Sequence, residues 1–146
     1  MDCAFCDATQ VTDRTIVENE LARAFPTNAP IVPGHTLIAP KRHVTYHVDL
    51  TSEERDAIEE LRMQLHTAMK KAFSTEGFNY AWNEEKIGGQ SVPHFHLHML
   101  PRKEGDAGVY QYEPREFIYR PLPTEQRAVS SEQELIEVAR VLKSAL

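Results

Sequence analysis

The sequence has no apolar run that approaches the length of about 20 residues needed to cross a membrane. Its first residues, MDCAFCDATQ, lack the basic region followed by an apolar stretch that marks a secretory signal. Internal repeats and low-complexity segments are missing as well. These absences argue against a membrane protein, and we expect the protein in the cytoplasm.

Positive charge is scarce, because 16 Lys and Arg stand against 22 Asp and Glu and the formal net charge is -6. An acidic surface repels a phosphodiester backbone, which argues against binding to nucleic acid. A small anionic ligand is not excluded, since a local site can be electropositive on an acidic molecule. The 146 residues, 41% of them apolar, are enough for one domain with its own core.

Short segments with strand character run through much of the chain. We expect strands at residues 15–17, 21–25, 36–39 and 78–82, and a further strand in the stretch that begins at Ser91. Three prolines and Gly34 indicate an irregular loop over residues 26–34. Because no β–α–β alternation is visible, the sequence predicts an α+β fold with a mainly antiparallel sheet of about five strands.

Two helices are expected to accompany this sheet. Thr51-Ser52-Glu53-Glu54 has the form of a capping box, in which Thr51 caps the helix and Glu54 reaches back. Apolar residues follow at helical spacing as far as Phe73, and Gly77 is interpreted as the stop, so one long amphipathic helix should pack on the sheet. A C-terminal helix should begin near Ser130 or Ser131.

Three of the seven histidines alternate strictly within SVPHFHLHMLPR, residues 91–102. Successive side chains of a strand point to opposite faces, so His94, His96 and His98 should share one face. The apolar residues between them should share the other face and pack on the long helix. A solvent-exposed polar face would also alternate, although it would not require histidine. A three-histidine metal site is a second alternative, because alternate strand positions can converge on a metal.

The residues that flank the histidines extend the pattern. Gly89-Gln90-Ser91-Val92 precedes them and Pro101-Arg102 follows, and the whole stretch resembles the signature of the histidine triad (HIT) superfamily. Residues 33–38, PGHTLI, and 40–43, PKRH, are similar to an earlier block of that family. The resemblance covers about residues 3–105 and implies a single HIT domain over 1–146, with 106–146 as a variable C-terminal extension.

The resemblance implies a nucleotide hydrolase or transferase that acts at an α-phosphate. His96 would be the nucleophile and form a nucleotidyl-histidine, while the carbonyl of His94 fixes its tautomer. His98 would hydrogen-bond the phosphate and help to protonate the leaving group. A neutral imidazole is a good nucleophile near pH 7, and the phosphoramidate that it forms is labile enough to turn over.

Other residues match substrate-binding positions of the family. Gln90 and Ser91 resemble phosphate contacts, and Asn83 stands ahead of their loop, where relatives carry Asn or Gln. His35 resembles a fourth histidine that packs near the triad. For Asn83 and Ser91 the structural alternative is the cap of a turn.

The nucleoside is expected against residues 25–31. Relatives often carry Asp or Asn at the position of Thr27 to hold the ribose hydroxyls, so Thr27 departs from the family pattern. Asn28, the next residue, is the candidate that takes over this contact. The expected ligand is a purine nucleotide or dinucleotide.

Only two cysteines are present, in the pair Cys3-Ala4-Phe5-Cys6. A redox dithiol would normally follow a strand and open a helix, which leaves two buried thiols or half of a zinc site. Relatives complete such a site with a histidine after the Pro-Lys block and with the first triad histidine, here His43 and His94. The resemblance thus implies a structural zinc with four protein ligands and no catalytic cofactor.

Several functions remain open. Asn83 and the Gly-Gly-Gln-Ser loop favour nucleoside phosphoramidates as substrates, whereas the basic residues after the triad favour dinucleoside polyphosphates. A dinucleoside polyphosphate phosphorylase would keep the same fold, and a nucleotide-binding regulatory module with little turnover is an alternative of another class. The family usually forms homodimers. Tyr110, Tyr112 and Arg115 are candidates for contacts on the leaving-group side.

Overall fold

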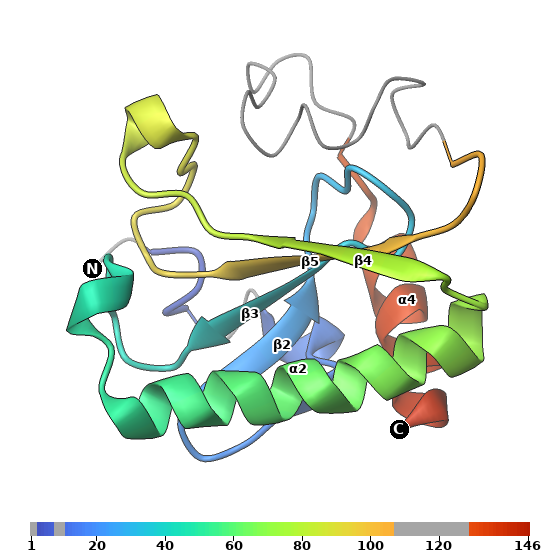
Figure 1. The fold of residues 1–146 in the computed structure, drawn as a ribbon, viewed down its shortest axis with the longest axis horizontal. Helices are drawn as coiled ribbons and strands as arrows, with labels where there is room; N and C mark the ends of the chain where they lie inside the picture. The colour runs from blue at the N-terminus through green and yellow to red at the C-terminus, as the bar shows by residue number, and fades with distance from the viewer. Residues whose placement is uncertain (1–2, 8–10, 107–128) are drawn as a thin grey trace.

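The computed structural model describes residues 3–7, 11–106 and 129–146, which contain a five-stranded sheet in the order β1-β2-β3-β5-β4 (Figure 1). Its strands are β1 (Val17–Glu18), β2 (Ala22–Pro26), β3 (Thr36–Pro40), β4 (Gly77–Ala81) and β5 (Leu97–Arg102). All neighbouring strands pair antiparallel, so the predicted α+β fold is confirmed. The candidates Tyr110, Tyr112 and Arg115 lie outside the described residues.

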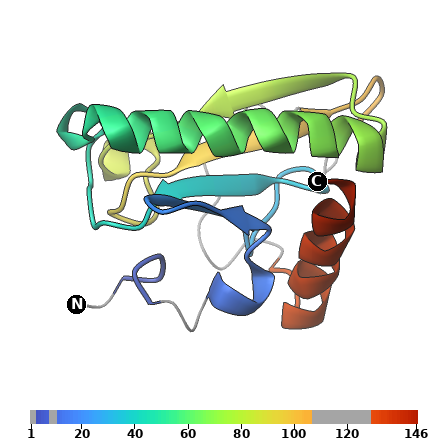
Figure 2. The same ribbon diagram turned by 90° about the horizontal axis from the view of Figure 1, so that it is seen from below.

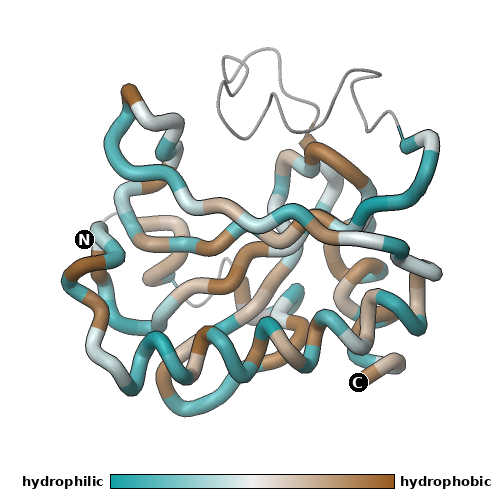
Figure 3. The backbone as a smooth tube through the Cα atoms, in the orientation of Figure 1, coloured by the Kyte–Doolittle hydropathy of each residue, from teal (hydrophilic) through white to brown (hydrophobic). Residues whose placement is uncertain are grey.

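The long helix α2 (Ser52–Phe73) packs along one face of the sheet (Figure 2). Its predicted capping box is confirmed: the Glu54 N–H donates to Thr51 Oγ1 at 3.1 Å, and the Thr51 N–H donates to Glu54 Oε1 at 2.9 Å. Figure 3 shows hydrophilic and hydrophobic colours alternating along the helix, as expected for one buried stripe. The buried stripe packs into the main core through Leu61, Leu65, Ala68 and Met69, among others.

The end of α2 differs from the prediction. The helix ends at Phe73, and Ser74 takes the left-handed conformation with φ at 54°. The interpretation of Gly77 as the helix stop is wrong, because Gly77 is the first residue of β4. A serine therefore occupies the left-handed position that glycine more often takes.

The C-terminal helix α4 (Glu132–Ala145) begins where the sequence predicted. Ser131 caps it and forms a second capping box with Glu134. Its buried Ala139 and Leu142 join the same core as α2. Figure 2 shows that the N-terminal segment, η1 (Thr12–Arg14) and the start of α4 lie on the side of the sheet opposite α2. Within the described ranges, neither α2 nor α4 has the length and apolar character that a membrane span requires.

Strand β5 is shorter than expected. It begins at Leu97, so His98 lies inside the strand while His94 and His96 precede it. Pro93 has no N–H to donate to a ladder, and the Phe95 N–H bonds to the Val44 carbonyl in the neighbouring loop. The alternation of faces nevertheless holds, because Phe95, Leu97 and Met99 are buried in the core against α2.

The first turn is also shifted from its predicted place. β1 pairs at Val17 and Glu18, one to two residues later than expected. Asn19 explains the shift, because its Oδ1 accepts hydrogen bonds from the N–H groups of Leu21 and Ala22 at 3.1 and 2.8 Å. The side chain thus makes the turn that connects β1 and β2.

Gly34 fixes the end of the proline-rich loop before β3. Its φ is +88°, and a Cβ atom there would lie 2.9 Å from the Phe73 ring and 3.0 Å from Cγ of Pro101. A side chain at this position would therefore require both neighbours to shift. The close approach sets the position of the next residue, His35, just before β3 begins at Thr36.

Candidate active site and metal centre

The imidazole of His96 has a defined tautomer. Its Nδ1 lies 2.8 Å from the carbonyl oxygen of His94, and a carbonyl can only accept a hydrogen bond. Nδ1 must therefore carry the proton, which leaves the lone pair on Nε2. His96 is 4% exposed, and this burial lowers its pKa, so the ring is neutral near pH 7. Neutral His96 thus presents a nucleophilic nitrogen.

His98 has the complementary tautomer because of His35. The Ile31 N–H donates to His35 Nδ1 at 3.1 Å, so the His35 proton is on Nε2. This Nε2–H donates to His98 Nδ1 at 2.9 Å, which places the His98 proton on Nε2. The ring centroids of His96 and His98 are 4.9 Å apart. The pair therefore offers one lone pair and one N–H from two adjacent rings.

Burial keeps these imidazoles neutral. It lowers the pKa of His35 to about 3, with a smaller contribution from repulsion by His96. Burial also lowers the pKa of His98 well below its ordinary value, and repulsion by His35 and His96 adds to the effect. His35, at 3% exposed, contacts His98 rather than open solvent. Its contribution to the site therefore passes through His98.

The loop before the histidines is held by its own side chains. Gln90 Oε1 accepts from the Glu85 N–H at 3.2 Å, and Gln90 Nε2 donates to the Thr45 carbonyl at 3.3 Å. Asn83 Nδ2 donates to the Gly89 carbonyl at 3.3 Å. Ser91, by contrast, is exposed. In this structure Gln90 and Asn83 shape the loop, and Ser91 presents its hydroxyl to solvent.

Thr27 and Asn28 lie just beyond the end of β2. Thr27 Oγ1 accepts from the Ala29 N–H at 3.4 Å, and the Asn28 carbonyl accepts from the Ser130 N–H at 2.8 Å. Thr27 and His35 also line a cavity of about 340 Å³ whose other wall includes Leu135 of α4. The segment before α4 is therefore attached to the loop where the nucleoside was expected.

A second group of side chains surrounds His94. Ligand atoms of Cys3, Cys6, His43 and His94 all lie within 4.8 Å of one another. His94 Nδ1 is 3.5 Å from Cys3 Sγ and 3.4 Å from Cys6 Sγ, and His43 Nδ1 is 3.3 Å from Cys6 Sγ. In a tetrahedral zinc site, bond lengths of about 2.3 Å to sulfur and 2.0 Å to nitrogen separate S and N by about 3.5 Å. The observed spacing fits such a site.

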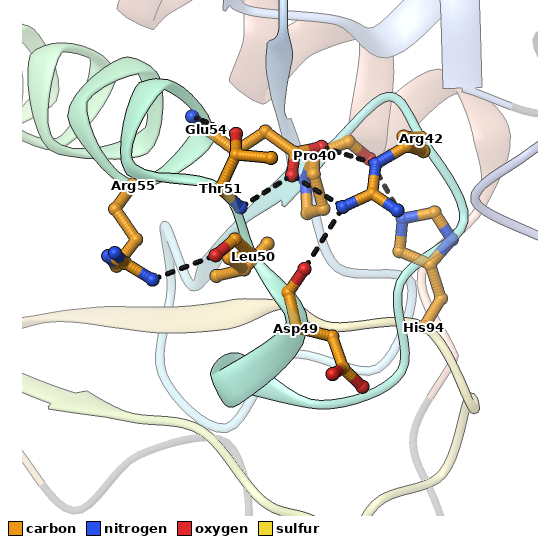
Figure 4. Close-up of polar contacts among 8 residues, drawn as sticks. All are labelled: Pro40, Arg42, Asp49, Leu50, Thr51, Glu54, Arg55 and His94. Atoms are coloured by element: carbon orange, nitrogen blue, oxygen red, sulfur yellow. Dashed lines mark hydrogen bonds and ion pairs between the residues drawn. The ribbon is translucent and has the colours of Figure 1, made fainter.

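The far side of the His94 ring supports the same conclusion. Nε2 lies 2.8 Å from the carbonyl oxygen of Pro40, so it carries the ring proton (Figure 4). Nδ1 then keeps its lone pair for a metal ion, in the arrangement that metal-bound histidines usually have. His94 therefore points its ring at the cysteines and its carbonyl at His96.

Arg42, which the sequence did not single out for a role of its own, holds the segment that carries His43. Its guanidinium donates to Glu54 Oε2 at 3.0 Å and Oε1 at 2.7 Å, and to the Asp49 carbonyl at 3.1 Å (Figure 4). The hydrogen bond from Arg42 lowers the pKa of Glu54. A signal was available, since a capping-box Glu that becomes buried needs a cation nearby. The two hydrogen bonds from Arg42 to Glu54 join the start of α2 to the segment that follows β3.

Acid should destabilise the protein partly through His35. The pKa of His35 is about 3 in the folded protein and about 6.5 in the unfolded chain. The contribution of His35 to the free energy of unfolding is therefore fully present above pH 6.5 and is lost as the pH falls toward 3. We expect the advantage of wild type over His35→Asn in unfolding free energy to shrink by about 2 kcal/mol between pH 7.5 and pH 5. Urea unfolding at both pH values measures this difference in unfolding free energy. A difference that stays constant with pH would contradict the low pKa of His35.

Comparison with known proteins identifies the family. Residues 8–105 match the family model "HIT domain". An uncharacterized HIT-like protein of Mycoplasma genitalium is 35% identical over 140 residues, 94% of this chain and 94% of that protein. The bis(5'-adenosyl)-triphosphatase of Dictyostelium discoideum is 32% identical over 114 residues, 78% of this chain and 73% of that protein.

A solved structure agrees with the sequence matches. The Zn-bound histidine triad family protein from Mycobacterium smegmatis has a TM-score of 0.73 to this chain at 26% identity, with 99% of this chain and 93% of that one covered. The five-stranded sheet, the long helix and the histidine pattern are thus found together with a matching family model. The chain belongs to the HIT family.

Proposed function

We propose that the protein is a nucleotide hydrolase or transferase in which His96 attacks the α-phosphorus of its substrate. The observation that carries the proposal is the pair of opposite tautomers, with a lone pair on His96 Nε2 and a proton on His98 Nε2. Nucleophilic attack requires the first, and departure of a basic leaving group requires the second. The similarity to the Dictyostelium triphosphatase supports this assignment.

The reaction proceeds in two steps. His96 Nε2 forms a bond to the α-phosphorus, and the bond to the leaving group breaks. The anionic substrate raises the pKa of His98, so His98 takes up a second proton on binding, gives one proton to the leaving group and returns to a neutral imidazole. Water then attacks the nucleotidyl-His96 and gives a proton back to His98 as the mononucleotide leaves. An acceptor other than water makes the same chemistry a transfer.

The surrounding residues have supporting roles in this proposal. The exposed Ser91 hydroxyl donates to phosphate oxygen, and Asn83 and Gln90 keep its loop in place. Thr27 and Asn28 contact the nucleoside at the end of β2. The substrate is a purine nucleotide, either a phosphoramidate or a dinucleoside polyphosphate, and the named relative favours the polyphosphate.

We also propose that Cys3, Cys6, His43 and His94 hold a structural zinc ion. The spacing of their ligand atoms supports it, as does the zinc bound by the Mycobacterium smegmatis protein. Four protein ligands leave no open coordination position, so zinc fixes His94 and the N-terminal segment without taking part in the reaction.

A homodimer is the proposed assembly. Strand β4 pairs with β5 alone within the described residues, so its other edge offers N–H and C=O groups to a second chain. Tyr80, Trp82 and Met63 are exposed on or near β4 and α2. A second copy that covered them would bury apolar surface as well as pair the strand.

Replacing the nucleophile tests the proposed reaction. Adenosine 5'-phosphoramidate and diadenosine tri- and tetraphosphate are given to wild type and to His96→Ala, with and without phosphate, and the products are separated by chromatography. We expect AMP from wild type and a loss of at least about 10³-fold in rate for His96→Ala. The control is His66→Ala, on α2 and away from the triad, which should keep wild-type rates.

The same experiment separates the alternatives. ADP formed only in the presence of phosphate would identify a phosphorylase. If wild type binds AMP and turns over none of these compounds, or if His96→Ala matches wild type, the proposed reaction is wrong and a regulatory nucleotide-binding module is the better description.

Metal analysis tests the zinc site independently of activity. Purified wild type should contain about one zinc per chain by mass spectrometry of the elements, since one tetrahedral site is present. Cys6→Ser should lose this zinc and unfold at a lower temperature, while His66→Ala should keep its zinc. Wild type without zinc after growth in zinc-supplemented medium would contradict the site.

Sedimentation equilibrium tests the assembly. We expect the mass of two chains at micromolar concentration, twice the 16.7 kDa of one chain. Pro101 has no N–H, so Phe78 and Pro101 form a non-hydrogen-bonded pair and the N–H of Tyr80 points away from β5. Tyr80→Pro removes this edge N–H and should shift the protein toward the monomer mass. A wild-type mass of one chain at all concentrations would contradict the homodimer.

A further inference from the structure

Arg14, the last residue of η1, is a buried arginine whose Nε has no hydrogen-bond partner among the described residues. The residue is 8% exposed, and its Nε is fully buried. Burial lowers the pKa of the guanidinium, and attraction to Glu132 at the start of α4 opposes the lowering. No ion pair between Arg14 and Glu132 is found among the described residues, so the buried Nε keeps an unused donor.

Arg14 is an exception among the arginines that the structure describes. Each of the others donates to a carboxylate or to a backbone carbonyl: Arg23, Arg42, Arg55, Arg62, Arg102 and Arg140. A buried charge without a partner destabilises a fold, so the position of Arg14 is unfavourable for the isolated chain. Departures of this kind are expected at functional sites.

Arg14 stands at one end of a row of side chains on the histidine face. The strand registers place His98 opposite Leu37 and Leu37 opposite Phe25, so these three share a face. The Arg14 guanidinium carbon lies 5.7 Å from the centroid of the Phe25 ring. Strands are about 4.8 Å apart, so two spacings separate His98 from Phe25 by about 10 Å, the scale of a nucleoside.

The partly buried Phe5 ring gives the face between the nucleophile and Arg14 an apolar surface. The Phe5 ring centroid is 5.0 Å from that of His96 and 5.2 Å from that of Phe25. Phe25 and Leu37 belong to one buried cluster against which Phe5 packs. A nucleobase has apolar faces and a polar edge, so an apolar surface with hydrogen-bond donors at its far end is complementary to it.

We propose that Arg14 binds the edge of the nucleobase and selects guanine over adenine; this inference rests on the proposed nucleotide chemistry at His96. Guanine presents two adjacent acceptors, O6 and N7, which an arginine can meet with two N–H groups. Adenine presents N7 beside an amino group, and that donor faces a donor of the guanidinium. The guanidinium of Arg14, whose Nε has no partner in the described part of the chain, would therefore discriminate between the two purines.

A comparison of guanosine and adenosine 5'-phosphoramidates tests the selectivity. Wild type should show a kcat/KM about tenfold or more higher for the guanosine compound, the discrimination of one bidentate contact. Arg14→Met keeps an apolar stem of similar length and removes the donors, so the ratio should fall to about 1. Arg140→Met, on the exposed face of α4, is the matched control and should keep the wild-type ratio.

Thermal unfolding separates a ligand contact from a structural role. Without nucleotide, Arg14→Met should unfold at the same temperature as wild type or higher, because it removes a buried unpaired charge. GMP should raise the unfolding temperature of wild type more than AMP does, and Arg14→Met should respond equally to both. A marked loss of stability in Arg14→Met with unchanged selectivity would overturn the proposal.

The outcomes also distinguish this inference from the reaction on which it rests. Turnover of both phosphoramidates at equal kcat/KM by wild type would overturn the role of Arg14 and leave the reaction intact. If wild type turns over neither compound, the reaction fails. The GMP and AMP shifts then still decide whether Arg14 selects the base.

Discussion

The contact between His96 Nδ1 and the His94 carbonyl is the one on which the site depends. It places the proton on one ring nitrogen and so leaves the other free to attack. His94 cannot move its carbonyl without moving its ring, and that ring is held by Pro40 on one side and lies among Cys3, Cys6 and His43 on the other. A metal ion in that cluster would orient the nucleophile through the main chain, at a distance from the reacting atoms.

The same strand geometry explains why the site lies on a stable support. Successive side chains alternate between the two faces of the strand. Burial of Phe95, Leu97 and Met99 against α2 therefore directs the histidines between them to the opposite face. The core therefore determines where the imidazoles stand. Arg42 extends this support, since its bonds to Glu54 tie the start of α2 to the segment that carries His43.

The features predicted correctly from the sequence are those that local spacing encodes. The start of α2 follows from a capping box, the start of α4 lies at one of the two serines that the sequence offered, and the burial of Phe95, Leu97 and Met99 follows from alternation. The features that were missed depend on distant contacts or on a single side chain. Ser74 rather than Gly77 takes the left-handed conformation, and Asn19 shifts β1 by making the turn with its own amide.

The candidate site shows the same contrast between features that local spacing predicts and features that depend on distant contacts. No spacing rule links Cys3 to His94, which are 91 positions apart, and only the family resemblance brought them together. The lack of a hydrogen bond at Arg14 Nε among the described residues could not be predicted, because it depends on which distant acceptors fail to reach that atom. An arginine seen only in the sequence is expected at the surface. Its burial, which only the structure shows, is what marks Arg14 as a candidate ligand contact.

Neutral histidines at the proposed site have a consequence for how a phosphate would be bound and cleaved. Burial lowers the pKa of both His96 and His98, so without substrate the rings offer dipoles rather than positive charges. A phosphate placed beside them is an anion, and a nearby anion raises the pKa of an imidazole. Binding would therefore favour a second proton on His98, which makes it an imidazolium, while His96 keeps the lone pair that the His94 carbonyl leaves on Nε2. As the leaving group separates and gains basicity, it becomes the better base and takes that proton. An imidazole that is neutral when empty can thus act as an acid when the substrate is bound, without a metal ion or a permanent charge at the reacting atoms.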